Sequence, residues 1–362
     1  MVHIHIPEEM IVEILSRLPV KSILKFKLVC KLWNSLLSDP RFSLVTKGRE
    51  HAIFWCSGKR CFGSLDHQYA IREIPRQCWD RQHLDFVGSC NGLVLFSTYG
   101  TRYDCYSYCY FYLLNPSTRS FRGLINFGRR ILYGENRITD YPVAYGFCFD
   151  KLSDDYKAIM VYYSSSSFPS QRALVFSLKR GTTLRDVSLP YMLRGTGVLA
   201  NGNLHWIDVN GQEIIGGDLM VCFDETTNRF SKLPTPAVVR GGNKPIYRLG
   251  VLDGCLCMSR YTAGIYTFKC ELFVMREYGV KESWATLCAI SGGANLRSVR
   301  GWEPLFFTKS GEELLISGSY CILAYNVKTK SLKEIHTYSG QESYVGPLRY
   351  VESLIPLGNF ER

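Results

Sequence analysis

Two kinds of turn recur at a fixed separation in this chain, and that separation constrains the fold more than any other feature of its sequence. The first is a Gly-led hairpin with Asn-Gly or Asp-Gly at its turn: GSCNGLVLF from Gly88, GVLANGNLHW from Gly197 and GVLDGCLCM from Gly250. Such dipeptides are strong signals for a two-residue turn between antiparallel strands. The second joins two strands through a polar turn, as in LLNPSTRSFRGL from Leu113 and CFDETTNRFSKL from Cys222.

The offset between the two turns predicts the architecture. Asn91 precedes Asn115 by 24 residues, and Asp253 precedes Arg276 by 23. Two hairpins at a fixed offset are what one four-stranded propeller blade requires. The polar turns at positions 66, 115, 224, 276 and 326 fall about 50 residues apart, with a wider gap holding units near 150 and 179, close to kelch-like spacing. We therefore expect a β-propeller of about six blades.

Short β-branched or aromatic runs, bounded by Gly, Asn, Asp or Ser, fill the chain beyond residue 49. They are Leu93–Phe96, Tyr110–Leu114, Ala144–Phe149, Ala158–Tyr163, Leu219–Phe223 and Leu314–Ile316. Runs of this kind predict strands, so residues 50–362 are expected to form one all-β domain. Tyr344–Leu357 reads as a strand pair that closes the ring, because closure removes exposed sheet edges.

The first 49 residues have a different, helical texture. Pro7 suits a first helical position, and Met10, Ile14 and Leu18 recur at helical spacing before Pro19. A second helix is expected after a cap at Ser22, and a third from Leu28 to Leu37. About 45 residues is marginal for an independent core, and apolar side chains lie on more than one face. This segment is therefore expected to bind a partner.

The run PEEMIVEILSRLPVKSILKFKLVCKLWNSLLSDPRF resembles an F-box of the plant type. The match covers the opening Pro, the LSRLPVKS junction, the V-C-K-x-W core and the closing SDPRF. The resemblance implies three helices that bind a Skp1-type adaptor and, through it, a cullin; the alternative is a three-helix subdomain packed only on its own chain. By match to the pattern, the adaptor-binding residues are Ile6, Pro7, Met10, Ile14, Leu15, Leu18, Pro19, Leu24, Val29 and Trp33.

The β region resembles the F-box-associated, kelch-like domain of plant F-box proteins. The matching stretches are NPSTR from Asn115, YGFCFDKLSDDYK from Tyr145, NGNLHW from Asn201, GVLDGCLC from Gly250 and MREYGVKESW from Met275. The resemblance extends to groups that include S-locus F-box proteins and F-box regulators of plant immune receptors. It implies a small all-α F-box at residues 1–49 followed by an F-box-associated β-propeller at 50–362. The Tyr- and Cys-rich segment Tyr99–Cys109 departs from the family pattern.

The sequence carries no motif that predicts catalysis. There is no phosphate-binding Gly-rich run, no G-x-S-x-G, no H-E-x-x-H and no paired cysteines at zinc spacing. We therefore expect a non-catalytic protein with neither a cofactor nor a metal. No apolar run approaches 18 residues, which predicts no membrane span. The 14 cysteines lie mostly in strand-like apolar runs, which favours a reducing cytoplasmic or nuclear location.

The net charge of +11 is spread over the chain, and basic residues outnumber acids in the first 49 positions. This favours an acidic partner surface. Nucleic acid is not expected as a partner, because no recognition module appears. The resemblance implies a substrate-recognition subunit of an SCF (Skp1–cullin–F-box) ubiquitin ligase. The alternative is a kelch-like propeller enzyme, or a glycan- or nucleic-acid-binding propeller, with a helical extension.

The protein substrate is not identified by any portable motif. Binding hot spots favour aromatic and Arg side chains on loops of a rigid scaffold, which points to Tyr99–Tyr108, Phe127–Tyr141 and Arg240–Tyr247. The alternative is that these are solvated loops only. The expected substrate-binding residues are Arg102, Tyr103, Arg129, Arg130, Tyr133, Arg137, Arg240 and Tyr247.

Overall fold

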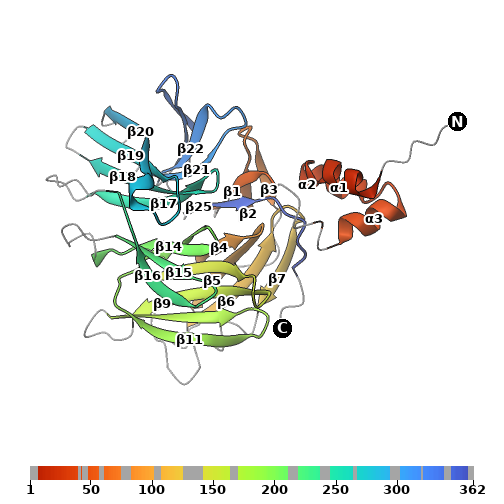
Figure 1. Cartoon of the computed structure of the whole chain (residues 1–362), viewed down its shortest axis with the longest axis horizontal. Helices are drawn as coiled ribbons and strands as arrows, with labels where there is room; N and C mark the ends of the chain where they lie inside the picture. Colours follow the sequence, from red (N-terminus) through yellow and green to blue (C-terminus); the bar gives the residue numbers. More distant parts are fainter. Residues whose placement is uncertain are drawn as a thin grey trace.

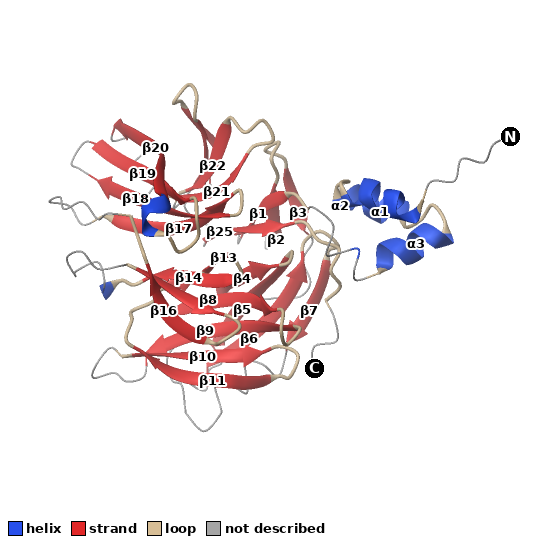
Figure 2. Cartoon of the chain, viewed as in Figure 1, coloured by secondary structure: helices blue, strands red, loops and turns tan. Residues whose placement is uncertain are grey.

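The computed structural model has three N-terminal helices followed by an all-β domain, a six-bladed β-propeller (Figures 1 and 2). It describes residues 7–39, 42, 48–56, 61–74, 83–101, 107–124, 142–163, 170–210, 219–236, 245–263, 267–293, 302–318, 321–337 and 344–357. Among the described residues, no helix is long and apolar enough to cross a membrane.

The three helices form the helical module, which comprises the described residues 7–39 and 42. They are α1 (Glu8–Ser16), α2 (Val20–Phe26) and α3 (Lys31–Ser38). Pro19 precedes α2 directly, so the expected cap at Ser22 is wrong, because a proline fixes φ at a helical value and starts the helix earlier. The third helix begins at Lys31 rather than Leu28, since the Cys30 thiol caps it by accepting from the Trp33 N–H.

Each blade is an antiparallel sheet whose strands follow one another outward from the ring axis. Blade one holds β1 (Glu50–Cys56), β2 (Cys61–Leu65) and β3 (Ile71–Ile74); blade two holds β4 (His83–Cys90), β5 (Leu93–Thr101), β6 (Ser107–Asn115) and β7 (Ser120–Leu124). Blade three holds β8 (Ala144–Asp150), β9 (Asp155–Tyr163), β10 (Gln171–Ser177) and β11 (Thr182–Leu189), with β12 (Gly195–Thr196) parallel to β8.

The remaining blades follow the same order. Blade four holds β13 (Val198–Ala200), β14 (Asn203–Ile207), β15 (Met220–Asp224) and β16 (Arg229–Leu233). Blade five holds β17 (Ile246–Leu252), β18 (Cys255–Ala263), β19 (Thr267–Met275) and β20 (Trp284–Gly293), and blade six holds β21 (Glu303–Phe307), β22 (Glu313–Ser317), β23 (Cys321–Asn326) and β24 (Leu332–Thr337).

The last strand, β25 (Tyr344–Val351), closes the ring. It pairs antiparallel with β1, from Glu50 opposite Val351 to Cys56 opposite Tyr344, and becomes the innermost strand of blade one. The expected strand pair at Tyr344–Leu357 is therefore wrong. Blade one lacks only one strand, so β25 completes it, and residues 352–357 continue as an extended segment without strand pairing.

The expected turns are present with the backbone conformations that their residues favour. Asn91 and Gly92 have φ of 52° and 77°, and Asn201-Gly202 and Asp253-Gly254 repeat the pattern, as a type I′ hairpin turn requires. In the polar turn of blade two, the Asn115 side-chain oxygen accepts from the N–H groups of Ser117 and Thr118. Asp224 and Asn326 repeat this arrangement, because Asx side chains readily mimic a backbone turn.

The irregular spacing in the middle of the sequence has a structural cause. The polar turn at Asp150 joins β8 to β9, so it stands where blades two, four and five have an Asn-Gly or Asp-Gly turn. The unit near position 179 is then the outer hairpin, β10 to β11. Blade three therefore follows the common plan with different turn chemistry.

All these turns lie on one side of the propeller, which we call the helical face because the helices attach there (Figure 1). Turn residues of neighbouring blades contact one another: Tyr69 with Glu313, Lys157 with Glu225, and Asn203 with Tyr278. Gly92 lies directly against Ser353, just past the end of β25. Strands alternate in direction, so Leu124 of β7 and Tyr163 of β9 lie at the opposite side, the distal face.

The core lies between adjacent blades. The indole of Trp206 in β14 packs on Gly146 of β8, where a Cβ would come within 2.8 Å of the ring, and donates to the Tyr145 carbonyl at 3.0 Å. Gly250 of β17 similarly faces Pro304 of β21, where a Cβ would come within 2.7 Å. Inner-strand glycines thus allow the backbones of neighbouring blades to approach closely, which explains why the predicted hairpins begin with Gly.

Candidate functional site

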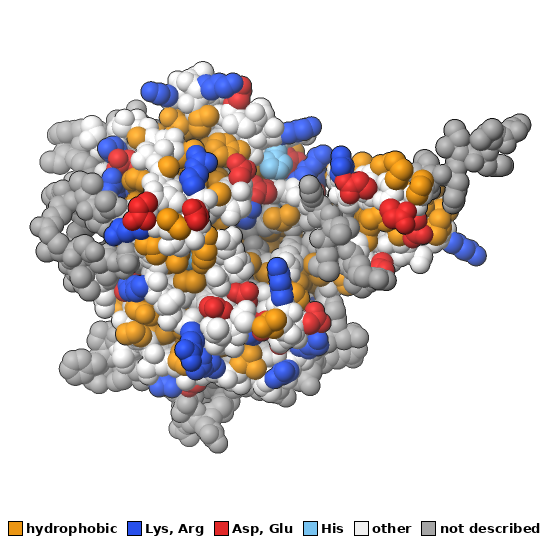
Figure 3. Space-filling view, in the orientation of Figure 1, with side chains coloured by type: hydrophobic (Ala, Val, Ile, Leu, Met, Phe, Trp, Pro, Cys, Tyr) orange, Lys and Arg blue, Asp and Glu red, His pale blue; other side chains and the backbone are white. Residues whose placement is uncertain are grey.

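Exposed large apolar side chains are concentrated on the helical module. Figure 3 shows apolar atoms at the surface of this module and also across the face of the propeller. Within the module, the exposed large apolar residues are Met10 (57 %), Ile14 (55 %), Leu28 (87 %), Val29 (61 %) and Leu32 (58 %). In the described part of the propeller, the corresponding residues are Ile71 (42 %), Leu152 (81 %) and Val209 (38 %). Apolar surface gathered in this way marks a protein-interaction site, whereas apolar side chains scattered singly are normal.

Local structure explains how the module presents these side chains. Met10 and Ile14 are four residues apart on α1, so they lie on one face of that helix. Leu28 and Val29 occupy the turn between α2 and α3, where no further helical packing covers them. The charged residues of the helices are also exposed, Lys21, Lys25 and Lys31 as well as Glu8, Glu9 and Glu13. An apolar surface with charged neighbours suits a partner that has apolar pockets and polar groups around them.

The residues predicted to bind the adaptor fall into three groups. Pro7, Met10, Ile14 and Val29 are exposed; Leu18, Pro19, Leu24 and Trp33 are half-buried. Leu15 is 3 % exposed and packs with Val20 and Ile23 inside the helical module, so it is a core residue in the free chain. Ile6 lies outside the described residues.

Two exposed residues of this surface, Leu28 and Leu32, were not predicted. The sequence pattern predicts one helix from Leu28 to Leu37, whereas Leu28 and Val29 lie in the turn before α3. The signal that could have found them is Cys30, a small side chain able to cap a helix, placed three residues before Trp33. A helix starting after Cys30 leaves Leu28 in a turn with no buried neighbour.

A second candidate site is the central channel of the propeller, a cavity of about 930 Å³ lined by the inner strands of all six blades. Its charged lining residues are Asp85, Arg194, Arg248, Glu303 and Arg349. Burial raises the pKa of Glu303 from 4.5 to about 7, against the charge of Arg248, which lowers it. Arg349 is paired with Glu50. In the described part of the chain, no group of three or more His, Cys, Asp or Glu is placed to hold a metal ion.

The histidine at this channel is poorly suited to acid–base chemistry at neutral pH. Burial lowers the pKa of His205 to about 4, although backbone hydrogen bonds at Val198 and Asn203 act in the opposite direction. Its Nε2 lies 2.8 Å from the Tyr278 hydroxyl and its Nδ1 lies 3.1 Å from the Val198 carbonyl. The imidazole is therefore neutral and held by structural hydrogen bonds.

Of the residues expected to bind substrate, only Tyr247 is described. It lies on β17 in the wall of the channel and is 4 % exposed, so its expected place on an exposed loop is wrong. The strand begins at Ile246, and Tyr247 pairs with Arg260 of β18. The others lie outside the described residues: Arg102, Tyr103, Arg129, Arg130, Tyr133, Arg137 and Arg240.

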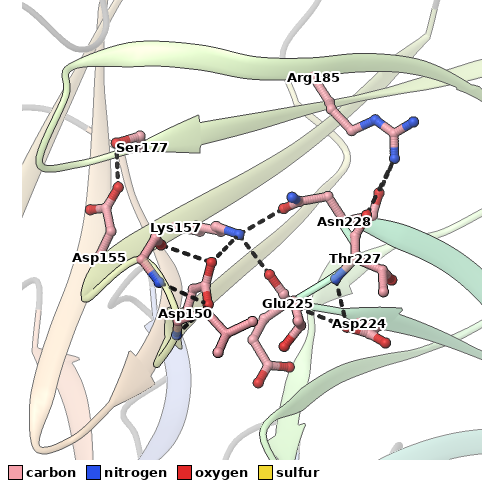
Figure 4. A network of polar contacts seen from close by, with 12 residues as sticks. Asp150, Asp155, Lys157, Ser177, Arg185, Asp224, Glu225, Thr227 and Asn228 are labelled. Carbon is pink, nitrogen blue, oxygen red and sulfur yellow. Dashed lines mark hydrogen bonds and ion pairs between the residues drawn. The ribbon is translucent and has the colours of Figure 1, made fainter.

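A buried polar network joins blades three and four at the helical face (Figure 4). Lys157 Nζ lies 2.8 Å from Asp150 Oδ2 and donates to the Glu225 carbonyl at 2.6 Å and to Asn228 Oδ1 at 2.9 Å. Burial raises the pKa of Asp150, but hydrogen bonds from Lys157, Ser153 and the Leu152 N–H outweigh it and lower that pKa to about 2. Two of these bonds, from Lys157 to Glu225 and Asn228, cross from blade three to blade four, so we assign the network to stability.

The fold and the exposed helical surface define a class: a propeller scaffold that carries a separate helical docking module. Comparison with known families is more specific. The F-box domain matches residues 4–44, and the F-box associated beta propeller domain matches residues 53–347. The chain belongs to the family of F-box proteins with an F-box-associated propeller.

Individual relatives agree with this assignment. The chain is 27 % identical to F-box protein CPR1 of Arabidopsis thaliana, over 97 % of this chain and 88 % of that protein. It is 28 % identical to an F-box/kelch-repeat protein of the same plant, over 80 % of each. Among solved structures, it resembles the Aleuria aurantia lectin at 12 % identity and a TM-score of 0.34, over 86 % of this chain and 97 % of that one. This last similarity is too weak to support any inference.

Proposed function

We propose that the chain is the substrate receptor of an SCF-type ubiquitin ligase. The helical module docks on a Skp1-type adaptor and through it on a cullin, and the propeller captures a protein substrate. The observation that carries the proposal is the exposure of Met10, Ile14, Leu28, Val29 and Leu32 on an F-box. In a free chain this apolar surface is unfavourable, and a partner that covers it removes it from water.

The receptor itself makes and breaks no covalent bond in this proposal. Ubiquitin transfer belongs to the conjugating enzyme that the cullin complex brings near, and the receptor contributes proximity, which raises the effective concentration of substrate. Two groups in the channel are consistent with this role, because His205 is neutral and Arg349 is paired. Glu303, whose pKa burial raises to about 7, is the channel group that the alternative, a propeller enzyme, would use.

We place substrate capture at the distal face or in the channel mouth that opens there. The helical face is occupied by short turns that contact one another and by the helices themselves, and tight two-residue turns offer little surface for recognition. Arg194 and Arg248, at the distal ends of the inner strands, are exposed and line the channel. A substrate at this side would face away from the adaptor.

We also propose a reducing location, the cytoplasm, the nucleus or both. The described cysteines are free thiols, and most are buried in the propeller. Burial raises the pKa of Cys90 and Cys257 to about 12, which keeps these thiols protonated and unreactive. Such cysteines act as small apolar core residues.

The test is substrate trapping with the full chain in plant cells. The double variant Leu28→Asp/Leu32→Asp should lose adaptor and cullin but keep its propeller interactors, which then accumulate because they are no longer ubiquitinated. Leu152→Asp, a matched change at an exposed leucine of the propeller, should retain the adaptor. The proposal fails if the wild-type chain recovers neither adaptor nor cullin, or if the double variant recovers both.

A further inference from the structure

The core of the helical module is completed by a residue from the other end of the chain. The buried apolar cluster of the module consists of Leu15, Val20, Ile23, Leu37, Phe42 and Leu354. Leu354 is 6 % exposed and lies three residues beyond the end of β25. In the described chain it is the one buried member of this cluster that the propeller domain supplies. Figure 1 shows the chain leaving β25 on the side where the helices attach.

Polar contacts hold the same segment to the start of β1, where the chain arrives from the helices. The Glu352 N–H donates to the Arg49 carbonyl at 2.8 Å, and its carboxylate lies 3.2 Å from His51 Nε2. Both side chains are almost completely buried. Burial raises the pKa of Glu352, but His51, Arg49 and the backbone N–H of Val20 outweigh it and hold that pKa below its usual value. The carboxylate is thus ionised and paired with the chain at the point where it enters the propeller.

The opposite side of the segment is fixed to the propeller. Asn115 Nδ2 donates to the Ser353 carbonyl at 3.1 Å and to the Ile355 carbonyl at 2.9 Å. The Ser353 N–H donates to Ser117 Oγ at 3.1 Å, and Ile355 packs against the apolar cluster between blades two and three. The side chains therefore alternate, with Leu354 directed into the helices and its neighbours held by blade two.

We propose that adaptor binding by the helices requires the C-terminal segment 352–357. The helices then bind the adaptor only after β25 has closed the propeller. The adaptor half of this proposal rests on the proposed function. About 40 residues bury too little surface for a stable core alone, and Leu354 supplies one of the six buried apolar side chains. It follows β25 by three residues, so it reaches the helices when that strand is paired with β1.

The consequence is an order of events. The helices are at the start of the chain and the segment that completes them is at its end. A receptor whose ring has not closed would have an incomplete helical core and would bind the adaptor weakly. Leu354 is therefore a positioning residue, which acts on the adaptor surface through the core of the helical module. Occupancy of the ligase would then be restricted to chains whose substrate-binding propeller is complete.

The experiment compares Leu354→Ala with Ile355→Ala in the full chain, since these neighbouring truncations point to opposite sides of the segment. Amide hydrogen exchange in α1–α3 should become at least about tenfold faster in Leu354→Ala, because a core cavity promotes local unfolding. It should stay within about twofold of wild type in Ile355→Ala and in Leu354→Met, which conserves the side-chain volume. Unchanged exchange in Leu354→Ala, or equal acceleration in Ile355→Ala, would overturn the proposal.

The affinity for a purified Skp1-type adaptor provides the second measurement. It should fall at least about fivefold in Leu354→Ala and recover in Leu354→Met, in parallel with exchange. Faster exchange with unchanged affinity would overturn the dependence of adaptor binding on the segment. A wild-type chain with protected helices that does not bind the adaptor would instead contradict the proposed function, and hydrogen exchange would still test the structural link.

Discussion

The helical module and the propeller use their apolar side chains in opposite ways. The propeller buries them in clusters between blades and closes its ring with β25, so its scaffold is complete. The core of the helical module includes Leu354, which follows β25 of the propeller, and Leu28, Val29 and Leu32 of the module are exposed. One chain thus combines a propeller whose apolar side chains are mostly buried with a helical module that leaves several of them exposed. The difference indicates which part of the chain is suited to bind a partner.

The largest effect is expected from opening the ring. Deleting residues 343–362 leaves the inner edge of β1 without its partner and exposes the side chains that Leu348 and Tyr350 cover. Unpaired apolar edges promote aggregation, so the truncated protein should be insoluble. Deleting only residues 358–362 should leave solubility unchanged. A soluble truncation at 343 that melts cooperatively would show that the propeller does not depend on closure.

The next effect tests how firmly neighbouring blades are joined. Lys157→Met removes the bonds to Glu225 and Asn228 of blade four and leaves the Asp150 carboxylate of its own blade buried without its cation. Removing one partner of a buried pair typically costs about 3–5 kcal/mol. Lys179→Met, which breaks an exposed pair with Asp154 on the same blade, should change the free energy of unfolding by less than about 0.5 kcal/mol. Chemical denaturation of the two variants checks this contrast. Equal losses would contradict the assignment of the Lys157 network to inter-blade stability.

The same network predicts a pH dependence. The pKa of Asp150 is lowered from 3.8 to about 2 in the folded chain. Its contribution to the free energy of unfolding is therefore fully present above about pH 4 and is lost as the pH falls toward 2. The stability difference between wild type and the Asp150→Asn/Lys157→Met double variant should shrink over this range. A difference that stays constant down to pH 2 would mean that Asp150 does not titrate in this way.

The smallest effect concerns turns on the helical face. Gly254 has φ of +78° and its Cβ position is open, so Gly254→Ala adds backbone strain without a clash. The cost should be about 1 kcal/mol. Gly146→Ala should cost more, because its Cβ would come 2.7 Å from Leu204 in the adjacent blade. If the two variants unfold at the same denaturant concentration, close approach between blades does not limit stability.

The sequence predicts the features whose chemistry is local. The Asn91-Gly92 turn and the Asn115 turn depend on the residues at those positions, so most strands could be placed, and offsets between turns indicated the blades. All three helices were predicted, although the starts of the second and third lie elsewhere. The chain end was misjudged because β25 pairs with β1, almost 300 residues away. Leu28 was assigned to a helix because the Cys30 cap was not recognised. Burial of Leu15 and the role of Leu354 depend on tertiary contacts that no local pattern reports.

The central claim is that exposed side chains of the helical module bind an adaptor, and Leu28 allows the most direct test. At 87 % exposure it contributes little to the fold of the free chain, unlike Leu15, whose truncation would also open the helical core. Calorimetry with a purified Skp1-type adaptor should show that Leu28→Ala costs about 2 kcal/mol, close to thirtyfold in affinity, without changing the melting temperature. Leu152→Ala, at an equally exposed leucine of the propeller, should bind as wild type does. Unchanged adaptor affinity in Leu28→Ala, or an equal loss in Leu152→Ala, would contradict this assignment of the adaptor surface.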